Sequence, residues 1–321
     1  MSKILILTEA GRGIGMGHLT RCQAIKEAFE TSGVTADMWV HFIEMSVDDS
    51  SISSVDWVPM VDLSARLEGY SHVIIDSYRA DKRLYETLAE ARPKLVIIDD
   101  YNRLQYAGDL VLNPNVFYQD IDYSNQDIPH TGGADFVILR EAFRASEPPA
   151  VKPEAESLLI SIGGSDFRLL LPQLIKIFLS SDIKELCVIA PEGLALELQD
   201  DRLTVLGRQS ANQMVQLFKD ADVVVSACGQ SLHELASLGK PVIGICLDID
   251  QEPNQRFYHS EGMLHQMICW DDGDLETALL TNLKYLSDFE VRSALSLLEP
   301  TLINTAGVHN IVQNLLTLSN D

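Results

Sequence analysis

Positive charge is scarce in this sequence of 321 residues. It has 24 lysines and arginines against 47 aspartates and glutamates, so its formal net charge is −23 at pH 7. A field of that sign repels polyanions unless a local group of basic side chains offsets it. We therefore expect no nucleic acid among its partners, and any phosphate site must depend on backbone N–H groups and helix dipoles.

Paired cysteines and long apolar runs are also missing. The five cysteines are scattered along the chain without a C-x-x-C pair, which is typical of reduced thiols in a cytosolic protein. No run approaches the ~18 apolar residues of a membrane span, and the N-terminus lacks the apolar stretch of a secretion signal. These absences predict a cytoplasmic protein with no stable membrane anchor.

Several common site motifs are absent as well. The sequence contains no G-x-G-x-x-G fingerprint and no G-x-x-x-x-G-K-[ST] phosphate loop. It has neither H-E-x-x-H nor another carboxylate–histidine cluster, and no G-x-S-x-G. We therefore expect no metal and no cofactor, and a serine-hydrolase mechanism has no support.

What the sequence does contain is a regular alternation of short apolar runs and helical patterns. Apolar residues make up 46% of the chain and its length suits two domains. Runs that are apolar throughout are typical of parallel strands buried on both faces. Predicted strands start at Lys3, Asp37, His72, Lys94, Asp109 and Phe136 in the first half, and at Ser157, Glu185, Leu203, Asp222, Pro241 and Gln266 in the second.

A segment with three prolines, residues 145–156, interrupts this alternation and has the composition of a linker. The sequence thus predicts two doubly wound α/β domains, residues 1–148 and 149–321. The second would end in a helical tail. Ligands of such sheets bind beyond the carboxyl ends of the strands, so the loops that follow the strands are where we look for function.

The first of these loops reads GRGIGMGHLTRC, with glycine at four alternate positions up to Gly17. Glycine allows the backbone to turn tightly and to approach a ligand. His18 follows at the predicted start of a helix, where an imidazole can serve as a general base. A histidine at a helix start can equally be an incidental polar residue or a cap.

The third and fourth predicted strands end in IIDSY and IIDDY. These endings bring Asp76, Tyr78, Asp99 and Asp100 to the same edge of the sheet, where catalytic groups collect. Asp76 and Asp99 can equally cap the turns that follow them. Tyr78 offers an exposed hydroxyl beside the candidate base.

The second half contains two turns suited to phosphate. Gly163, Gly164 and Ser165 follow a predicted strand and precede a helix, as do Gly229, Gln230 and Ser231. Glu234, one turn into the second of these helices, can accept from ribose hydroxyls or can be an ordinary solvated residue. Asn254 and Gln255 stand at a later helix start, where an asparagine orients a sugar or a water, or caps the helix.

Taken in order, the segments GMGHLTRC, IIDSY, IIDDY, IGGSD, SACGQSLHELASLGKPVI and NQ resemble the family of UDP-sugar hydrolases of pseudaminic acid biosynthesis and their spore-coat polysaccharide relatives. The second half resembles, more distantly, the nucleotide-binding domain of the peptidoglycan N-acetylglucosamine transferase. The resemblance implies a GT-B architecture, in which two Rossmann-like domains face each other across a cleft.

The resemblance also implies a reaction. Water would remove UDP from a UDP-2,4-diacetamido-2,4,6-trideoxy sugar without a metal, on the route to a nonulosonic acid of bacterial surface glycans. The implied catalytic residues are His18, Tyr78 and Asn254. The implied nucleotide-binding residues are Gly163, Gly164, Ser165, Gly229, Gln230, Ser231 and Glu234, and the candidate substrate-binding residues are Gly17, Arg21, Asp100 and Gln255.

Two other functions fit the same sequence. A GT-B glycosyltransferase would use the same UDP-amino-sugar donor with a sugar or lipid acceptor in place of water. A sensor protein would bind the UDP-sugar without turning it over.

Overall fold

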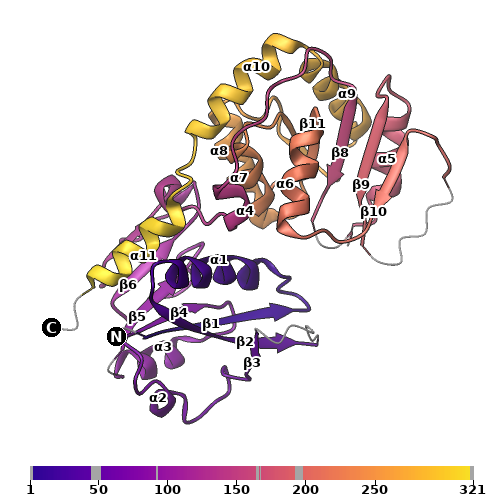
Figure 1. Cartoon of the computed structure of the whole chain (residues 1–321). Coiled ribbons are helices and arrows are strands. Elements are labelled where there is room, and N and C mark those ends of the chain that lie inside the picture. Colours follow the sequence, from indigo (N-terminus) through magenta and orange to yellow (C-terminus); the bar gives the residue numbers. More distant parts are fainter. Residues whose placement is uncertain are drawn as a thin grey trace. The chain divides into compact units, whose positions relative to one another are not determined.

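The computed structural model describes residues 3–44, 52–91, 93–163, 166, 168–191 and 198–318 (Figure 1). The chain divides into two compact units. The first is built from the residues up to Glu141 together with those from Asn304 onward, and the second is Ala142–Ile303. Each unit is organised around its own parallel sheet, which confirms the prediction of two doubly wound α/β domains.

The first unit contains a seven-stranded sheet in the order β3-β2-β1-β4-β5-β6-β7. Strands β2 and β3 are added on one side of β1, and the later strands from β4 onward are added on the other side. The point between β1 and β4 where the strand order reverses is the switch point at which doubly wound sheets bind ligands. Its strands are β1 (Lys3–Gly11), β2 (Thr35–Ile43), β3 (Ser53–Ser54), β4 (His72–Asp76), β5 (Lys94–Ile98), β6 (Leu110–Asn113) and β7 (His130–Gly132).

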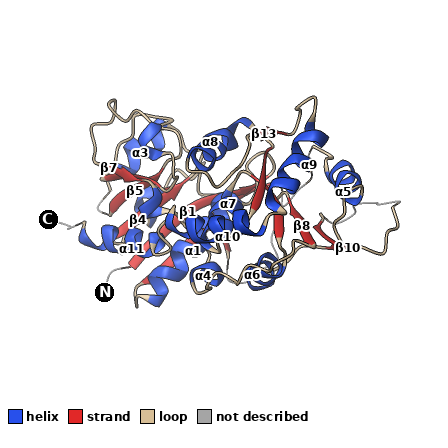
Figure 2. Cartoon of the chain, turned by 90° about the horizontal axis from the view of Figure 1, so that it is seen from above, coloured by secondary structure: helices blue, strands red, loops and turns tan. Residues whose placement is uncertain are grey.

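Helices cover both faces of this sheet (Figure 2). α1 (Gly17–Thr31) and α11 (Gly307–Thr317) share one apolar core with the sheet, whereas α2 (Leu63–Arg66) and α3 (Lys82–Ala89) pack on the other face. This arrangement follows from the apolar sequences of the strands. β1 and β4 are buried along almost their whole length and need cover on two sides.

The second unit contains a six-stranded sheet in the order β10-β9-β8-β11-β12-β13, with its switch point between β8 and β11. Helices α5 and α9 pack into one core with this sheet. The strands are β8 (Ser157–Ser161), β9 (Glu185–Ile189), β10 (Leu203–Leu206), β11 (Val223–Ala227), β12 (Val242–Cys246) and β13 (Ile268–Cys269). The helices are α5 (Leu171–Leu179), α6 (Ala211–Asp220), α7 (Gln230–Ser237), α8 (Glu252–Ser260), α9 (Leu275–Leu286) and α10 (Phe289–Leu298). The short helix α4 (Glu141–Arg144) lies where the chain passes from the first unit to the second. All six strands predicted here are confirmed.

One strand prediction in the first unit is wrong. The apolar run that starts at Phe136 forms no strand: Ala134–Phe136 is a turn of 3-10 helix, and the next four residues are irregular. The run is apolar because it packs under α11, where Ile138 shares a core with Val308. The two backbones approach so closely that a Cβ on Gly307 would lie 2.2 Å from the carbonyl oxygen of Val137.

The division between the units also differs from the expected boundary after residue 148. Residues 142–148 belong to the second unit, where the ring of Phe143 packs against that of Phe218 with the centroids 5.9 Å apart. The expected C-terminal tail of the second domain instead completes the first unit through α11. Its periodic apolar residues supply a face for α1, a contact that no local pattern reveals.

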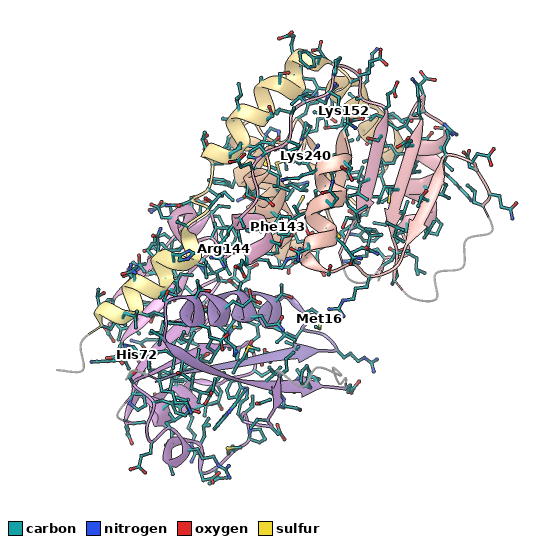
Figure 3. All side chains as sticks on the ribbon, in the orientation of Figure 1. Met16, His72, Phe143, Arg144, Lys152 and Lys240 are labelled. Atoms are coloured by element: carbon teal, nitrogen blue, oxygen red, sulfur yellow. The ribbon has the colours of Figure 1, made fainter. Side chains whose placement is uncertain are left out.

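A buried carboxyl group stands out in the second unit. Glu299 is fully buried, and neither of its carboxylate oxygens has a hydrogen-bond partner among the described residues. Burial raises its pKa well above the usual range, against the opposing charge of Lys240 (labelled in Figure 3). Burial also lowers the pKa of Lys240 to about 8. Glu299 therefore holds its proton more strongly in the folded chain than in the unfolded chain.

Glu299→Gln should stabilise the protein, and more so at pH 8 than at pH 5. The unfolded chain loses the Glu299 proton above about pH 4.3, whereas the folded chain keeps it to a higher pH. Stability is therefore lost as the pH rises through this window. Thermal unfolding at both pH values tests this, with the exposed Glu261→Gln as the matched control. An equal change at both pH values would contradict it.

Candidate active site

The candidate site of the first unit lies at its switch point. His18 belongs to the first turn of α1, directly after β1, and Asp76 is the last residue of the neighbouring strand β4. The loop between β1 and α1 needs glycine, since Gly13 and Gly15 have φ angles of +80° and +79°. The fold thus delivers both side chains to one edge of the sheet.

His18 is anchored by a buried carboxylate. Its Nδ1 lies 2.6 Å from Oδ1 of Asp76, and both side chains are almost fully buried. At this distance the imidazole donates from Nδ1, because a carboxylate can only accept. The remaining nitrogen, Nε2, then carries a lone pair and can accept a proton.

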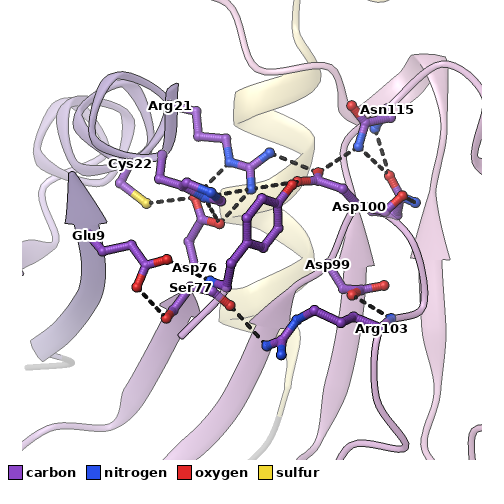
Figure 4. A network of polar contacts seen from close by, with 12 residues as sticks. Glu9, Arg21, Cys22, Asp76, Ser77, Asp99, Asp100, Arg103 and Asn115 are labelled. Atoms are coloured by element: carbon purple, nitrogen blue, oxygen red, sulfur yellow. Dashed lines mark hydrogen bonds and ion pairs between the residues drawn. The ribbon is translucent and has the colours of Figure 1, made fainter. Parts of the chain in front are cut away.

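Arg21, one turn along α1 from His18, joins two carboxylates (Figure 4). It donates from Nε and Nη2 to Asp76, at 2.6 and 2.5 Å, and from Nη1 and Nη2 to Asp100, at 2.8 and 3.0 Å. Burial raises the pKa of both carboxyls, but the charge of Arg21 outweighs it and keeps each pKa below the usual range. Both carboxylates are therefore ionised.

Tyr78 completes the group. Its ring meets the ring of His18 edge-on, with the centroids 4.5 Å apart, and its hydroxyl donates to Oδ2 of Asp100 at 2.7 Å. Burial and the nearby charge of Asp100 raise the pKa of Tyr78 far above its usual value. The hydroxyl is thus protonated at all physiological pH values, and the expected juxtaposition of Tyr78 with His18 is confirmed.

Asp76 and Asp99 could each have capped the turn that follows its strand, but the two carboxylates have different partners. Asp99 accepts from the backbone N–H of Asn102 and from the hydroxyl of Tyr106, so it does fix a turn. Asp76 caps nothing among the described residues. It accepts from His18 and Arg21, and the thiol of Cys22 lies 3.4 Å away.

Sequence reasoning missed three other participants. Asn115 donates from Nδ2 to Asp100 at 2.7 Å, and Asn113 donates to the carbonyl of Asp100. Fully buried Glu9 accepts from the hydroxyl of Ser77 and from the backbone N–H of Tyr78, at 2.7 Å each. The available signal was position: Glu9 lies near the carboxyl end of β1, and Asn113 and Asn115 lie at or just after the carboxyl end of β6, where candidate residues were sought.

The predicted phosphate turns of the second unit follow the two strands beside its switch point. Gly163, after β8, is exposed with a φ of +105°, while Gly164 and Ser165 lie outside the described residues. Gly229 follows β11 and is the N-cap of α7, where it supplies no side chain to bind the first-turn N–H groups. A Cβ on Gly229 would approach only the amide of Gln251, at 4.0 Å, so the turn is open on that side.

The other predicted residues of this unit lie along α7 and α8. Gln230 and Ser231 are half-buried in the first turn of α7, whereas Glu234 is only 1% exposed. Asn254 is the third residue of α8 and not its cap, and its Oδ1 is buried without a partner in the described part of the chain. Gln255 is fully buried and donates to the carbonyl of Ile268 at 2.7 Å, which ties α8 to β13.

Among the described residues, no three His, Cys, Asp or Glu side chains are grouped so that they could hold a metal ion. None of the helices within the described ranges is long and apolar enough to cross a membrane.

Comparison with known proteins gives sequence relatives at low identity. No family model matches the chain. The spore coat polysaccharide biosynthesis protein SpsG of Bacillus subtilis is 24% identical over 280 residues, which are 78% of this chain and 78% of that protein. The pseudaminic acid cytidylyltransferase and UDP-2,4-diacetamido-2,4,6-trideoxy-beta-L-altropyranose hydrolase of Helicobacter pylori is 23% identical over 273 residues, 82% of this chain; the chain spans 48% of that protein's length.

Solved structures show the same architecture. Acinetobacter baumannii MurG matches with a TM-score of 0.65 at 14% identity, over 98% of this chain and all of that one. S. aureus MnaA, solved with UDP, matches with a TM-score of 0.64 at 12% identity, over 100% and 98% of the two chains. This chain therefore has the GT-B fold, and it is similar in sequence to a spore-coat polysaccharide biosynthesis protein and to a UDP-altropyranose hydrolase.

Proposed function

We propose that this protein hydrolyses a UDP-activated diacetamido-trideoxy sugar, with His18 as the general base. The observation that carries the proposal is the bond between Nδ1 of His18 and the buried Asp76, which leaves Nε2 as the proton acceptor. The names of the two sequence relatives support the substrate class, since one is a UDP-altropyranose hydrolase and the other a polysaccharide biosynthesis protein.

In the proposed step, a water oxygen attacks the anomeric carbon while its proton passes to Nε2 of His18. The bond between that carbon and the diphosphate oxygen breaks, and its electron pair leaves with UDP. General-base help of this kind contributes ~10²–10⁴-fold. Tyr78, packed edge-on against the imidazole, keeps the ring in place for the transfer.

The leaving diphosphate needs stabilisation, which we assign to the second unit. The first turn of α7 offers backbone N–H groups and the positive end of a helix dipole behind the open turn at Gly229. Ser231 can add a hydroxyl donor. In this proposal Gly163, Gly164, Ser165, Gln230 and Glu234 complete the nucleotide site, and Asn254 orients the sugar or the water.

Hydrolysis in ¹⁸O-water tests the proposal. The protein is incubated with a panel of UDP-amino-sugars, with and without sugar and lipid acceptors, and UDP and the sugar are followed by NMR and mass spectrometry. We expect UDP release without an acceptor and the ¹⁸O label in the sugar, because the anomeric C–O bond breaks.

The other results would each overturn hydrolysis at the anomeric carbon. Label in the phosphate of UDP would mean attack at phosphorus. Release that requires an acceptor would mean a glycosyltransferase, and binding without release would mean a sensor.

A further inference from the structure

We propose that Tyr101 is a specificity-determining residue of the first unit, whose ring forms, together with that of Tyr78, an aromatic surface that binds the methyl groups of an acetamido-deoxy sugar. The inference rests on the proposed function for the class of sugar. It goes beyond that function, because it states which sugars the site prefers and which side chain is responsible.

The two tyrosines are unusual in their exposure. Tyr78 is 40% exposed and Tyr101 is 39% exposed, whereas the other Phe, Tyr and Trp side chains in the described part of the first unit are buried or half-buried. Each tyrosine comes two residues after an aspartate, Asp76 at the end of β4 and Asp99 directly after β5. Because β4 and β5 are neighbours in the sheet, the exposed rings of this unit gather at one place on its carboxyl edge.

Tyr101 lies beside the polar side chains of the candidate active site. It directly follows Asp100, whose carboxylate accepts from Tyr78 and from Arg21. Its hydroxyl is also near that of Tyr78: burial and the charge of Asp100 raise the pKa of Tyr78, and the charge that an ionised Tyr101 would carry raises it further. Since the ring of Tyr78 contacts that of His18, a ligand held at His18 lies next to both tyrosines.

The turn that carries Tyr101 is fixed by hydrogen bonds. The next residue, Asn102, has a φ of +53°, and its backbone N–H donates to the carboxylate of Asp99. Its side-chain amide donates to the carbonyl oxygen of Asp122 and to the side chain of Asn125. The backbone on this side of Tyr101 is therefore held in place, and the exposure of the ring is a property of the turn.

The ring of Tyr101 also has a rigid support. It stacks on the ring of Phe117, with the centroids 6.0 Å apart and the planes 19° from parallel. Phe117 is only 2% exposed, so it belongs to the packed interior beneath the site. An aromatic ring held in this way needs no rearrangement to bind a ligand, which lowers the entropy that binding costs.

The chemistry of the aromatic surface complements that of the residues beside it. His18, Arg21 and Asp100 offer charges and hydrogen bonds, which suit hydroxyl and amide groups but leave a methyl group without a favourable contact. Exposed aromatic rings supply that contact, because covering them removes apolar area from water. A 2,4-diacetamido-2,4,6-trideoxy sugar has methyl groups at C6 and on each acetamido group. N-acetylglucosamine has hydroxyls at C4 and C6 and gains less from the same surface.

The test measures binding in the full-length protein with His18→Asn as the background, so that the ligand is not consumed. Tyr101→Ala removes the ring, and Tyr101→Phe keeps the ring without its hydroxyl. Tyr285→Ala is the matched control, since that side chain is 38% exposed and stacks on His265 but belongs to the second unit. Calorimetric titration gives Kd for UDP, UDP-N-acetylglucosamine and the UDP-2,4-diacetamido-2,4,6-trideoxy sugar, and saturation-transfer NMR shows which sugar protons contact the protein.

We expect Tyr101→Ala to raise Kd for the diacetamido-trideoxy ligand about 10-fold and Kd for UDP-N-acetylglucosamine less than about 3-fold, in the range that contacts with single methyl groups provide. Kd for UDP should not change. The methyl protons of the sugar should receive saturation with Tyr101→Phe and Tyr285→Ala and lose most of it with Tyr101→Ala. If Tyr101→Ala does not fold, Tyr101→Gln must show the same loss, because its stem still covers Phe117 but its end is polar.

An unchanged Kd for the diacetamido-trideoxy ligand in Tyr101→Ala, or an equal change for all the ligands, would overturn the proposal. So would an equal loss in Tyr101→Phe, because the hydroxyl would then be the binding group. Binding that depends on Tyr101 in a protein that releases no UDP would leave this inference standing and refute the proposed function. Hydrolysis with selectivity that is unaffected by Tyr101→Ala would do the reverse.

Discussion

His18→Asn should lower kcat by ~10²–10⁴-fold while leaving the affinity for UDP nearly unchanged. The variant removes the nitrogen that accepts the water proton, and UDP is assigned to the second unit. The side-chain amide of asparagine can donate to Asp76 in place of Nδ1 of His18, so the buried carboxylate keeps a partner. Steady-state kinetics and calorimetric titration with UDP measure the two effects separately.

The matched control is His259→Asn, which changes an exposed histidine of α8. It should retain the wild-type rate. If His18→Asn turned over at the wild-type rate, His18 would have no part in the chemistry; if it lost UDP affinity to the same degree as kcat, the residue would act in binding.

Ending the chain at Ile303 should unfold the first unit while the second remains structured. The truncation removes α11, in which Val308, Ile311, Val312 and Leu315 are each at most 1% exposed. Four such side chains contribute on the order of 10 kcal/mol, comparable with the whole stability of a typical domain. Hydrogen exchange read by mass spectrometry should show fast exchange in β1 and β4 and continued protection in β8 and β11.

A chain ending at Leu318 is the control and should exchange like the full-length protein. Slow exchange of β1 in the Ile303 truncation would show that α11 is dispensable. It would also contradict the division of the chain described above.

Much of the fold could be predicted from sequence because parallel strands buried on both faces leave unbroken apolar runs. That signal fails where burial and strand formation separate. The run at Val137 is buried by a helix and forms no strand. In contrast, β7 is a strand although its three residues are exposed or half-buried. The position of α11 was also out of reach, because an amphipathic pattern shows that a helix has a partner but not which one.

The candidate site was predictable in part for a similar reason. Loops after strands were the right places to look, and His18, Arg21, Tyr78 and Asp100 do come together. Sequence could not show which of these side chains bond to one another. Asp76 and Asp99 occupy equivalent positions at the ends of adjacent strands, yet only the first meets the histidine, because β4 is the strand beside β1.

The return of α11 to the first unit has a consequence for synthesis of the chain. The second unit, Ala142–Ile303, is an insertion within the first, and two covalent connections join them. A ribosome that makes the chain from its N-terminus completes the inserted unit before α11 exists. We therefore expect the inserted unit to finish folding first. Until α11 has been made, the apolar residues of the first unit that α11 covers remain exposed.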